Sequence, residues 1–203
     1  MQDDFKKYLP QHLTEEDQNR LFSSLNDFPN SFPKKAYSTK ANFNPIIYQG
    51  DGFRQMPHSN LPTNNIKEVK TIILSNTCDL SPDNSRFSPS RLVQAPIIEL
   101  KKYHQLLISL NNKTKSKSPS TITTHIENIR KQRINNIFFL PENSFIEDSI
   151  VPFDNVSSLP SNYLSGDEVP NRRLFSLSDY GFYVFLYKLS IHFTRMKEGV
   201  SRG

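Results

Sequence analysis

Two short apolar runs stand near the middle of the chain, with a long polar segment between them. Residues 71–74 and 92–95 contain β-branched side chains and are bounded by Pro, Asn or Asp, a pattern typical of buried strands. The residues that follow the first run, 75–79, read Ser-Asn-Thr-Cys-Asp and begin a stretch rich in turn-forming residues. We therefore predict two strands of one sheet, with small polar side chains at the edge of the core, where functional sites often form.

Apolar residues at helical spacing predict three helices in the second half of the chain. They are expected at about residues 99–110, at about 119–133 and at 178–198. The last helix begins at the capping pair Ser178-Asp179 and stops before Gly199. Because its apolar residues lie nearly all round the helix, it should be buried on more than one side. We expect it to form a subunit interface, and the protein to be a homodimer.

Shorter patterns complete the predicted elements. Apolar runs predict strands at residues 46–48, 137–140 and 149–153, residues 58–65 should form a loop, and one turn of helix is expected near Pro160. Near the N-terminus, the sequence Thr14-Glu15-Glu16-Asp17 is typical of a helix start. We divide the chain into an N-terminal helical arm, residues 1–42, and a main domain, residues 43–203, with a helical insertion at residues 99–136.

The composition excludes several classes of protein. No apolar run is long enough to span a membrane and the N-terminus has no apolar signal region, so we expect no membrane partner. Cys78 is the only cysteine among the 203 residues, so no intrachain disulfide can form, and a reducing, cytoplasmic location fits. A thiolate-bound metal cluster is excluded and the 5 His are scattered, so we expect no metal and no cofactor.

Positive charge is concentrated in the inserted segment. Residues 101–136 hold eight Lys or Arg and one Glu, a net charge of +7, whereas the whole chain has a net charge of +5. A basic lobe on a nearly neutral body is the pattern expected for a polyanionic partner, and a solvated, mobile insertion is the alternative. With Tyr103 available to stack on bases, the candidate nucleic-acid contacts are Lys101, Lys102, Arg130, Lys131 and Arg133.

Several short motifs resemble those of one toxin family. Residues 84–90 (Asn-Ser-Arg-Phe-Ser-Pro-Ser) precede the second predicted strand, and Pro96-Ile97 follows it. Gly50-Asp51 stands where a first long strand would open, and residues 148–151 (Asp-Ser-Ile-Val) precede Leu159-Pro160. In this order, and with a closing C-terminal helix, the motifs are similar to those of the MazF/PemK-type toxins over about residues 50–98 and 138–196.

The resemblance implies an α+β fold built on a small SH3-like β-barrel, to which the helical insertion, the N-terminal arm and the C-terminal helix are added. It also implies a homodimer that cleaves single-stranded RNA without a metal ion and that a protein antitoxin inhibits. The family uses an Arg before the second strand and a Thr or Ser after Pro-Ile, and here these positions hold Lys70 and Ile98. Lys lacks the planar fork of Arg and Ile cannot donate a hydrogen bond, so this site departs from the family's.

The first functional hypothesis is a metal-independent endoribonuclease of a toxin–antitoxin or phage-defence system. RNA cleavage through the 2′-hydroxyl needs a base, an acid and a cation near the phosphate. We assign Asp79 as the base and Lys70 as the cation, while Ser75, Asn76 and Thr77 would orient the phosphate. His58 is a more distant acid–base candidate.

The second hypothesis is a non-catalytic barrel that binds nucleic acid or a partner protein as a sensor or regulatory subunit. Asn76 and Asp79 would then only cap a turn. A third hypothesis, nucleophilic chemistry at Cys78, has no His nearby in the motif to support it. Geometry discriminates between the first two, because an enzyme requires Lys70, Asn76 and Asp79 to converge on one cleft.

Overall fold

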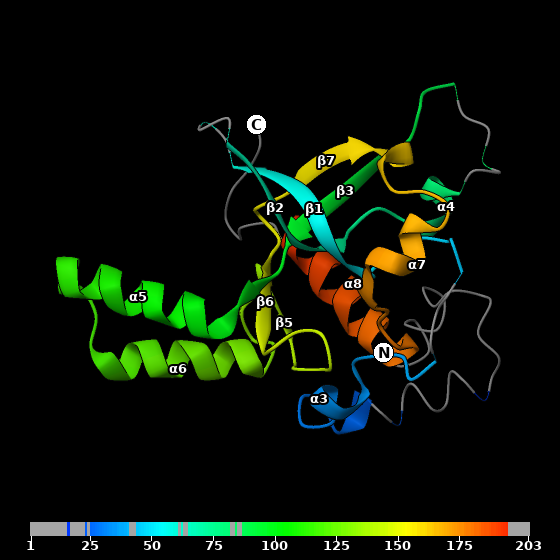
Figure 1. Cartoon of the computed structure of the whole chain (residues 1–203). Helices are drawn as coiled ribbons and strands as arrows, with labels where there is room; N and C mark the ends of the chain where they lie inside the picture. The colour runs from blue at the N-terminus through cyan, green and yellow to red at the C-terminus, as the bar shows by residue number, and fades with distance from the viewer. Residues whose placement is uncertain are drawn as a thin grey trace, which may run out of the picture.

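The protein has an α+β fold with two antiparallel sheets, seen in a computed structural model that describes residues 16, 23, 25–40, 44–60, 62, 65–81, 84 and 87–194 (Figure 1). The larger sheet has the strand order β7-β3-β2-β1-β8, formed by β7 (Ser157–Pro160), β3 (Arg91–Pro96), β2 (Asn65–Ile73), β1 (Gly52–Asn60) and β8 (Arg173–Phe175). The smaller sheet has the order β4-β6-β5, formed by β4 (Ile98–Glu99), β6 (Ser149–Pro152) and β5 (Ile137–Leu140).

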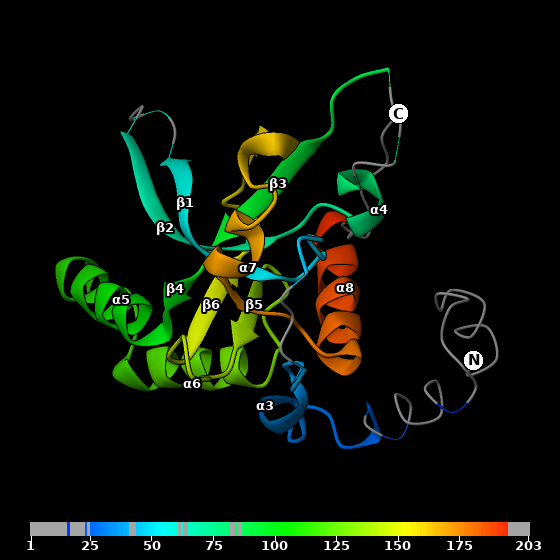
Figure 2. The same ribbon diagram turned by 45° about the vertical axis from the view of Figure 1, so that its right-hand side comes forward.

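Two long helices form a hairpin that projects from the sheets. The hairpin connects β4 to β5 and consists of α5 (Leu100–Thr114) and α6 (Pro119–Arg130), which lie side by side in both ribbon views (Figures 1 and 2). The remaining helices are α3 (Phe32–Lys35), α4 (Thr77–Leu80), the 3-10 helix η1 (Ser161–Tyr163), α7 (Glu168–Arg172) and α8 (Asp179–Thr194). The basic insertion is therefore a two-helix arm on a β-rich body.

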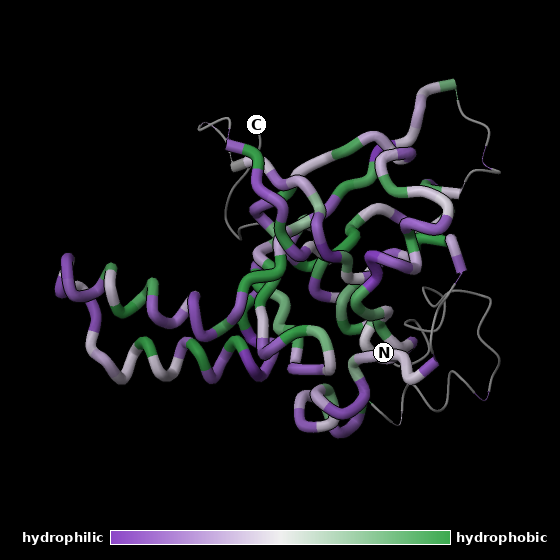
Figure 3. Tube along the Cα trace, in the orientation of Figure 1, coloured by the Kyte–Doolittle hydropathy of each residue, from purple (hydrophilic) through white to green (hydrophobic). Residues whose placement is uncertain are grey.

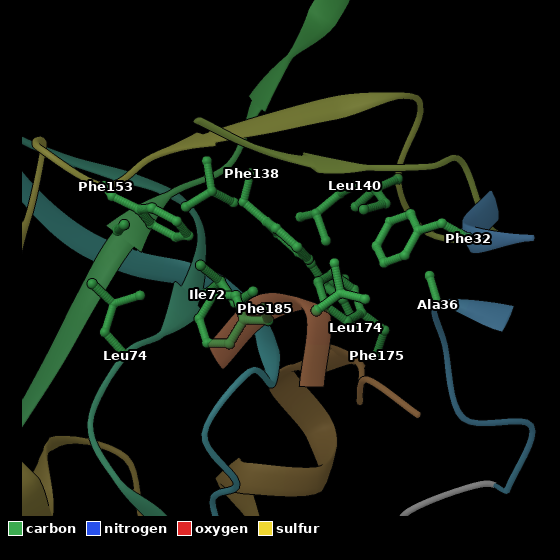
Figure 4. Close-up of a cluster of buried hydrophobic side chains, with 14 of the residues drawn as sticks. Phe32, Ala36, Ile72, Leu74, Phe138, Leu140, Phe153, Leu174, Phe175 and Phe185 are labelled. Carbon is green, nitrogen blue, oxygen red and sulfur yellow. The ribbon is translucent and has the colours of Figure 1, made fainter. Parts of the chain in front are cut away.

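The main hydrophobic core lies where α8 meets both sheets. Phe138 of β5 contacts Phe32 of α3 and Phe185 of α8, at centroid distances of 5.7 and 5.2 Å, and Ile72 of β2 belongs to the same cluster (Figure 4). The T-shaped geometry of both ring pairs is one that aromatic rings prefer. Burial of a large apolar side chain stabilises a fold by about 1.5–3 kcal/mol, so this cluster fixes α8 against the strands.

Two smaller clusters complete the interior. One, on the other face of the larger sheet, includes Phe53, Met56 and Leu92, and the other joins the root of the helical hairpin to the smaller sheet through Ile129 and Phe139. Hydrophobic residues are concentrated in the sheets and near the root of the hairpin, whereas the far end of the hairpin is largely hydrophilic (Figure 3). The hairpin is therefore anchored at its root, and its far end is left for solvent or a partner.

The larger sheet curls strongly toward closure. His58 of β1 lies 3.0 Å from the Ser157 hydroxyl of β7, measured to its Nδ1, although β2 and β3 stand between these strands in the sheet. In a flat sheet three strand spacings would separate them by about 14 Å. The side-chain amide of Gln94 on β3 makes a second connection, because it donates to the Pro57 carbonyl of β1 at 2.7 Å. Side chains thus connect β1 and β7, and the described strands have no backbone ladder that closes a barrel.

Most elements predicted from periodicity are confirmed. The predicted strands at 71–74, 92–95, 137–140 and 149–153 correspond to β2, β3, β5 and β6, and the three predicted helices to α5, α6 and α8. Helix α5 ends four residues later than expected, at Thr114. Most of the first 28 residues, where the N-terminal arm is predicted to be helical, lie outside the described residues, as does the end of the predicted helix 178–198.

Two expectations about the larger sheet are wrong. Residues 46–48 form no strand, and the loop expected at 58–65 instead contains the ends of β1 and β2. The turn of helix expected near Pro160 is present as η1, and it directly follows the unpredicted strand β7. β1 is difficult to predict because it alternates poorly and carries Pro57, and its register shifts between Phe53 and Met56 where Gln55 has a φ of 57°. The resemblance places its start more accurately, since β1 begins directly after Gly50-Asp51.

Candidate functional site

The polar segment after β2 holds backbone groups of its neighbours. The Ser75 hydroxyl donates to the Arg91 carbonyl at 2.9 Å and accepts from the Val93 amide at 2.7 Å, so it fixes the start of β3. Asn76 caps α4 by accepting from the Cys78 amide at 2.9 Å. The Thr77 hydroxyl accepts from the Gln49 amide at 3.0 Å. Three of the predicted catalytic side chains, those of Ser75, Asn76 and Thr77, therefore form hydrogen bonds that stabilise the surrounding backbone.

A cleft of about 470 Å³ lies beside this segment, between α4, β3 and the C-terminal part of α8. Ser75, Asn76 and Asp79 line it, as the sequence predicted for an exposed polar edge. Arg91 lines it as well, and its guanidinium is held by Ser158, with Nε donating to the hydroxyl at 2.7 Å and Nη2 to the carbonyl at 3.0 Å. A carboxylate and a guanidinium thus border one cleft.

Lys70 lies away from this cleft. Its Nζ donates to the Phe145 carbonyl at 2.9 Å, and it lines a different groove together with Glu142 and Glu147. Lys70 and Ser75 are five positions apart in the chain, about 16 Å for an extended segment. The convergence of Lys70, Asn76 and Asp79 that an enzyme requires is therefore absent.

The two positions that the resemblance singles out lie near each other, with Lys70 on β2 of the larger sheet and Ile98 at the start of β4 in the smaller sheet. The Ile97 amide donates to the Lys70 carbonyl at 2.8 Å, and β4 begins at Ile98. Glutamates line the groove that contains Lys70 and Ile97, which gives it a chemistry unlike that of an Arg and Thr pair. The two departures from the resembled pattern are thus found at one place in the fold.

Two further candidates, Tyr103 for base stacking and His58 for acid–base chemistry, make contacts within the protein instead. Tyr103 is half-buried inside the hairpin, where its hydroxyl and the His125 Nε2 are 3.1 Å apart, so its ring does not form an exposed platform for bases. His58 is 8 % exposed, and its Nε2 is 3.0 Å from the Asn155 Oδ1, in addition to the contact with Ser157. A neutral His58 satisfies both partners if Nε2 carries the proton. Its observed contacts connect β1 to β7.

The eight basic residues of the segment 101–136 are all exposed, but their surroundings differ. At the root, Lys102 forms an ion pair with Glu99 at 2.6 Å and Arg130 forms one with Asp148. Glu142 and Glu147 border the groove that contains Lys101 and Arg130. Nearby carboxylates weaken the attraction of this root for a polyanion. Of the five predicted contacts, Lys101, Lys102 and Arg130 lie beside these carboxylates, and Lys131 and Arg133 follow α6 at the same end of the hairpin.

The tip of the hairpin is more strongly cationic, and sequence analysis undervalued it. Lys113, Lys115 and Lys117 are exposed and form no ion pair with any described residue. Lys113 lies in the last turn of α5 and Lys115 is its C-cap. The backbone beyond them is held because Asn111 donates to the Lys117 carbonyl and accepts from the Lys117 amide, both at 2.9 Å. Ser118 then caps α6. The spacing Lys-x-Lys-x-Lys between two predicted helices was the signal.

Charged groups also occur inside the protein, and no pattern in the sequence predicted their burial. Asp51 and Arg173 form an ion pair at 2.9 Å, with side chains only 1 % and 5 % exposed. Burial raises the pKa of Asp51, and the Arg173 charge partly offsets this. Lys188 of α8 is 5 % exposed and donates to Gln132 Oε1 at 2.9 Å and to the Ile137 carbonyl. Burial lowers the pKa of Lys188 to about 7.

Helix α8 uses most of its apolar surface within one chain. Val184 and Phe185 are buried in the main core, and among its large apolar side chains only Tyr187 and Phe193 are clearly exposed. The apolar pattern that suggested a subunit interface is thus largely explained by packing against the sheets. The homodimer stays a prediction.

Comparison of the sequence with models of known protein families and with curated proteins gave no match. Among the described residues, no group of three or more His, Cys, Asp or Glu side chains is arranged to hold a metal ion. None of the helices in the described part of the chain has the length and apolar character of a membrane span.

Proposed function

We propose that this protein binds single-stranded RNA through the tip of the α5–α6 hairpin. The observation that carries the proposal is a set of three exposed lysines at the hairpin tip: Lys113 in the last turn of α5, Lys115 at its C-cap and Lys117 in the loop that follows, where Asn111 holds the backbone. Lysines that neutralise phosphates release counterions, which favours binding of any sequence. The choice of single-stranded RNA follows the resemblance to the MazF/PemK-type toxins, which act on it.

The proposal includes a diverged SH3-like barrel of the MazF/PemK type as the body that carries the hairpin. The curl of the larger sheet supports it, because His58 and Gln94 connect β1 with β3 and β7 across the concave face. The start of β1 after Gly50-Asp51 supports it as well. A second copy of the chain and an inhibitory partner protein are the partners that the resemblance suggests.

The test replaces Lys113, Lys115 and Lys117 together by Gln. Binding to a fluorescent single-stranded RNA of about twelve nucleotides is measured by anisotropy at low salt. We expect the affinity to fall at least about tenfold, because three phosphate contacts lose their charge. All three side chains are exposed, so the variant should fold normally, which circular dichroism would check.

The matched control replaces three exposed lysines of the body, Lys34, Lys40 and Lys67, by Gln. It changes the net charge of the protein by the same amount. Binding that weakens equally in both triple variants would mean that only the overall charge matters, and the hairpin tip would then not be the interface.

RNA cleavage is a second candidate function, and one observation favours it. Asp79 and Arg91 border the same cleft, where a carboxylate could accept the 2′-hydroxyl proton and a guanidinium could stabilise the charge of the pentavalent phosphate. In this form Arg91 takes the role that the sequence had given to Lys70. Incubation of the RNA without metal tests it: cleavage lost in Asp79→Asn, with binding retained, would establish the activity, whereas uncleaved RNA bound by the wild type would leave a binding protein.

A further inference from the structure

The cleft between α4, β3 and α8 has a lining of mixed chemistry. Its apolar lining residues are Leu74, Val93, Val156, Leu189 and Phe193, and its polar ones include Asn76, Asp79 and Arg91. Its volume of about 470 Å³ is within the range of small-molecule sites, which combine apolar walls with a few polar groups. The combination suits a ligand that has a flat apolar part and an anionic part.

Phe193 supplies an exposed aromatic face in this cleft. It lies in the last turn of α8 and is 64 % exposed, whereas Phe185, two turns earlier, is fully buried in the core. An aromatic ring left in water beside apolar walls gains stability when a flat ring covers it. Nucleobases stack on such side chains whatever their sequence.

Arg91 supplies a positioned cation at the edge of the same cleft. The hydrogen bonds of Nε and Nη2 to Ser158 hold its guanidinium on the surface of the sheet. Because the side chain is already ordered, a phosphate that binds it costs little additional conformational entropy. The fork of donors on Arg suits phosphate better than the single ammonium of Lys.

We infer that this cleft binds one unstacked base of a single-stranded nucleic acid, with the base against Phe193 and its phosphate on Arg91. The inference rests on the proposed function, since it names a second contact for the same ligand. A base within a duplex is covered on both faces and cannot enter, so the cleft selects single strands. The hairpin tip then supplies attraction for the backbone, and the cleft supplies contact with a base.

The experiment compares two fluorescent ligands of about twelve nucleotides: an oligouridylate and an abasic strand with the same backbone. Wild type, Phe193→Ala and Arg91→Met are measured by anisotropy. We expect wild type to prefer the oligouridylate by about tenfold, Phe193→Ala to lose this preference, and Arg91→Met to weaken binding of both strands. Phe145→Ala is the matched control, because Phe145 is 59 % exposed and lies outside the cleft.

Equal binding of both strands by wild type, or an unchanged preference in Phe193→Ala, would overturn the inference. The proposed function would survive either result, provided that the Lys113, Lys115 and Lys117 variant weakens both strands alike. If wild type binds neither strand, the proposed function fails and the inference fails with it.

Discussion

Arg173 illustrates how single residues hold this fold together. Its guanidinium bonds to Asp51 of the turn before β1 and to the carbonyls of Asn44 and Ile46, and it lies 5.6 Å from the centre of the Phe53 ring. These contacts join β8 to an irregular segment that has few backbone bonds of its own. A buried ion pair adds little net stability, but removal of one partner leaves a costly buried charge.

Arg173→Met should therefore lower the free energy of unfolding by about 3–5 kcal/mol at neutral pH. Without Arg173 the pKa of Asp51 rises further above its unfolded value, so the folded state binds a proton more readily than the unfolded state. The loss should shrink as the pH falls toward about 4. Urea denaturation at several pH values measures this.

A double variant, Asp51→Asn with Arg173→Met, removes the charge as well and should recover part of the stability. This account of the pair would be contradicted if the loss of stability in Arg173→Met were the same at every pH. It would also be contradicted if the double variant were no more stable than Arg173→Met.

At the scale of elements, Lys188 connects α8 to the root of the hairpin. Its amine reaches Gln132, which follows α6 and whose side chain also donates to the Phe139 carbonyl at 2.7 Å and accepts from the Phe139 amide at 3.1 Å. One buried network therefore joins a helix, a hairpin and a strand. Buried amines lose their proton more readily, because the charged form is poorly solvated.

Deprotonation of the buried Lys188 amine should make the stability of the protein depend on pH. Between about pH 7 and pH 10 an unfolded lysine keeps its proton while the buried amine has lost it, so stability rises with pH in this window. Lys188→Met lacks this contribution. The difference in unfolding free energy, wild type minus variant, should therefore increase by roughly 2–4 kcal/mol from about pH 7 to pH 10. Parallel curves for the two proteins in chemical denaturation would show that the amine does not titrate in this range.

At the scale of the whole molecule, the positive charge is concentrated in one region. Residues 101–136, which include the hairpin, carry more positive charge than the chain has overall, and the least compensated part is the hairpin tip, far from the sheets (Figure 1). Such an arrangement should orient an approaching polyanion before contact and should depend strongly on ionic strength.

The salt dependence of RNA binding tests this arrangement. For single strands each neutralised phosphate adds about 0.7 to the slope of log affinity against log salt. Loss of Lys113, Lys115 and Lys117 should thus reduce the magnitude of the slope by about 2. The body variant with Lys34, Lys40 and Lys67 replaced should keep the wild-type slope, and a slope unchanged in both variants would place the phosphate contacts elsewhere.

Sequence patterns predicted the elements whose signal is local. The apolar runs gave β3, β5 and β6, and helical spacing gave α5, α6 and α8, because the period of burial is written directly into neighbouring residues. The excess charge of the hairpin could also be counted without a structure. β1 was not predicted because its sequence is polar and contains Pro57. Its pairing with β2 and β8 in the tertiary structure makes it a strand.

The candidate site depended on the tertiary structure. The sequence placed Ser75, Asn76 and Asp79 at the edge of the core, but it could not tell that Lys70 would lie elsewhere. It could not tell either that Arg91 and Phe193, about a hundred residues apart, would border one cleft. The direction of a side chain depends on strand register and sheet curl, and these are set by contacts between distant segments. The sequence by itself determined which segments are helical, extended or charged, and the packing of those segments decided which side chains meet.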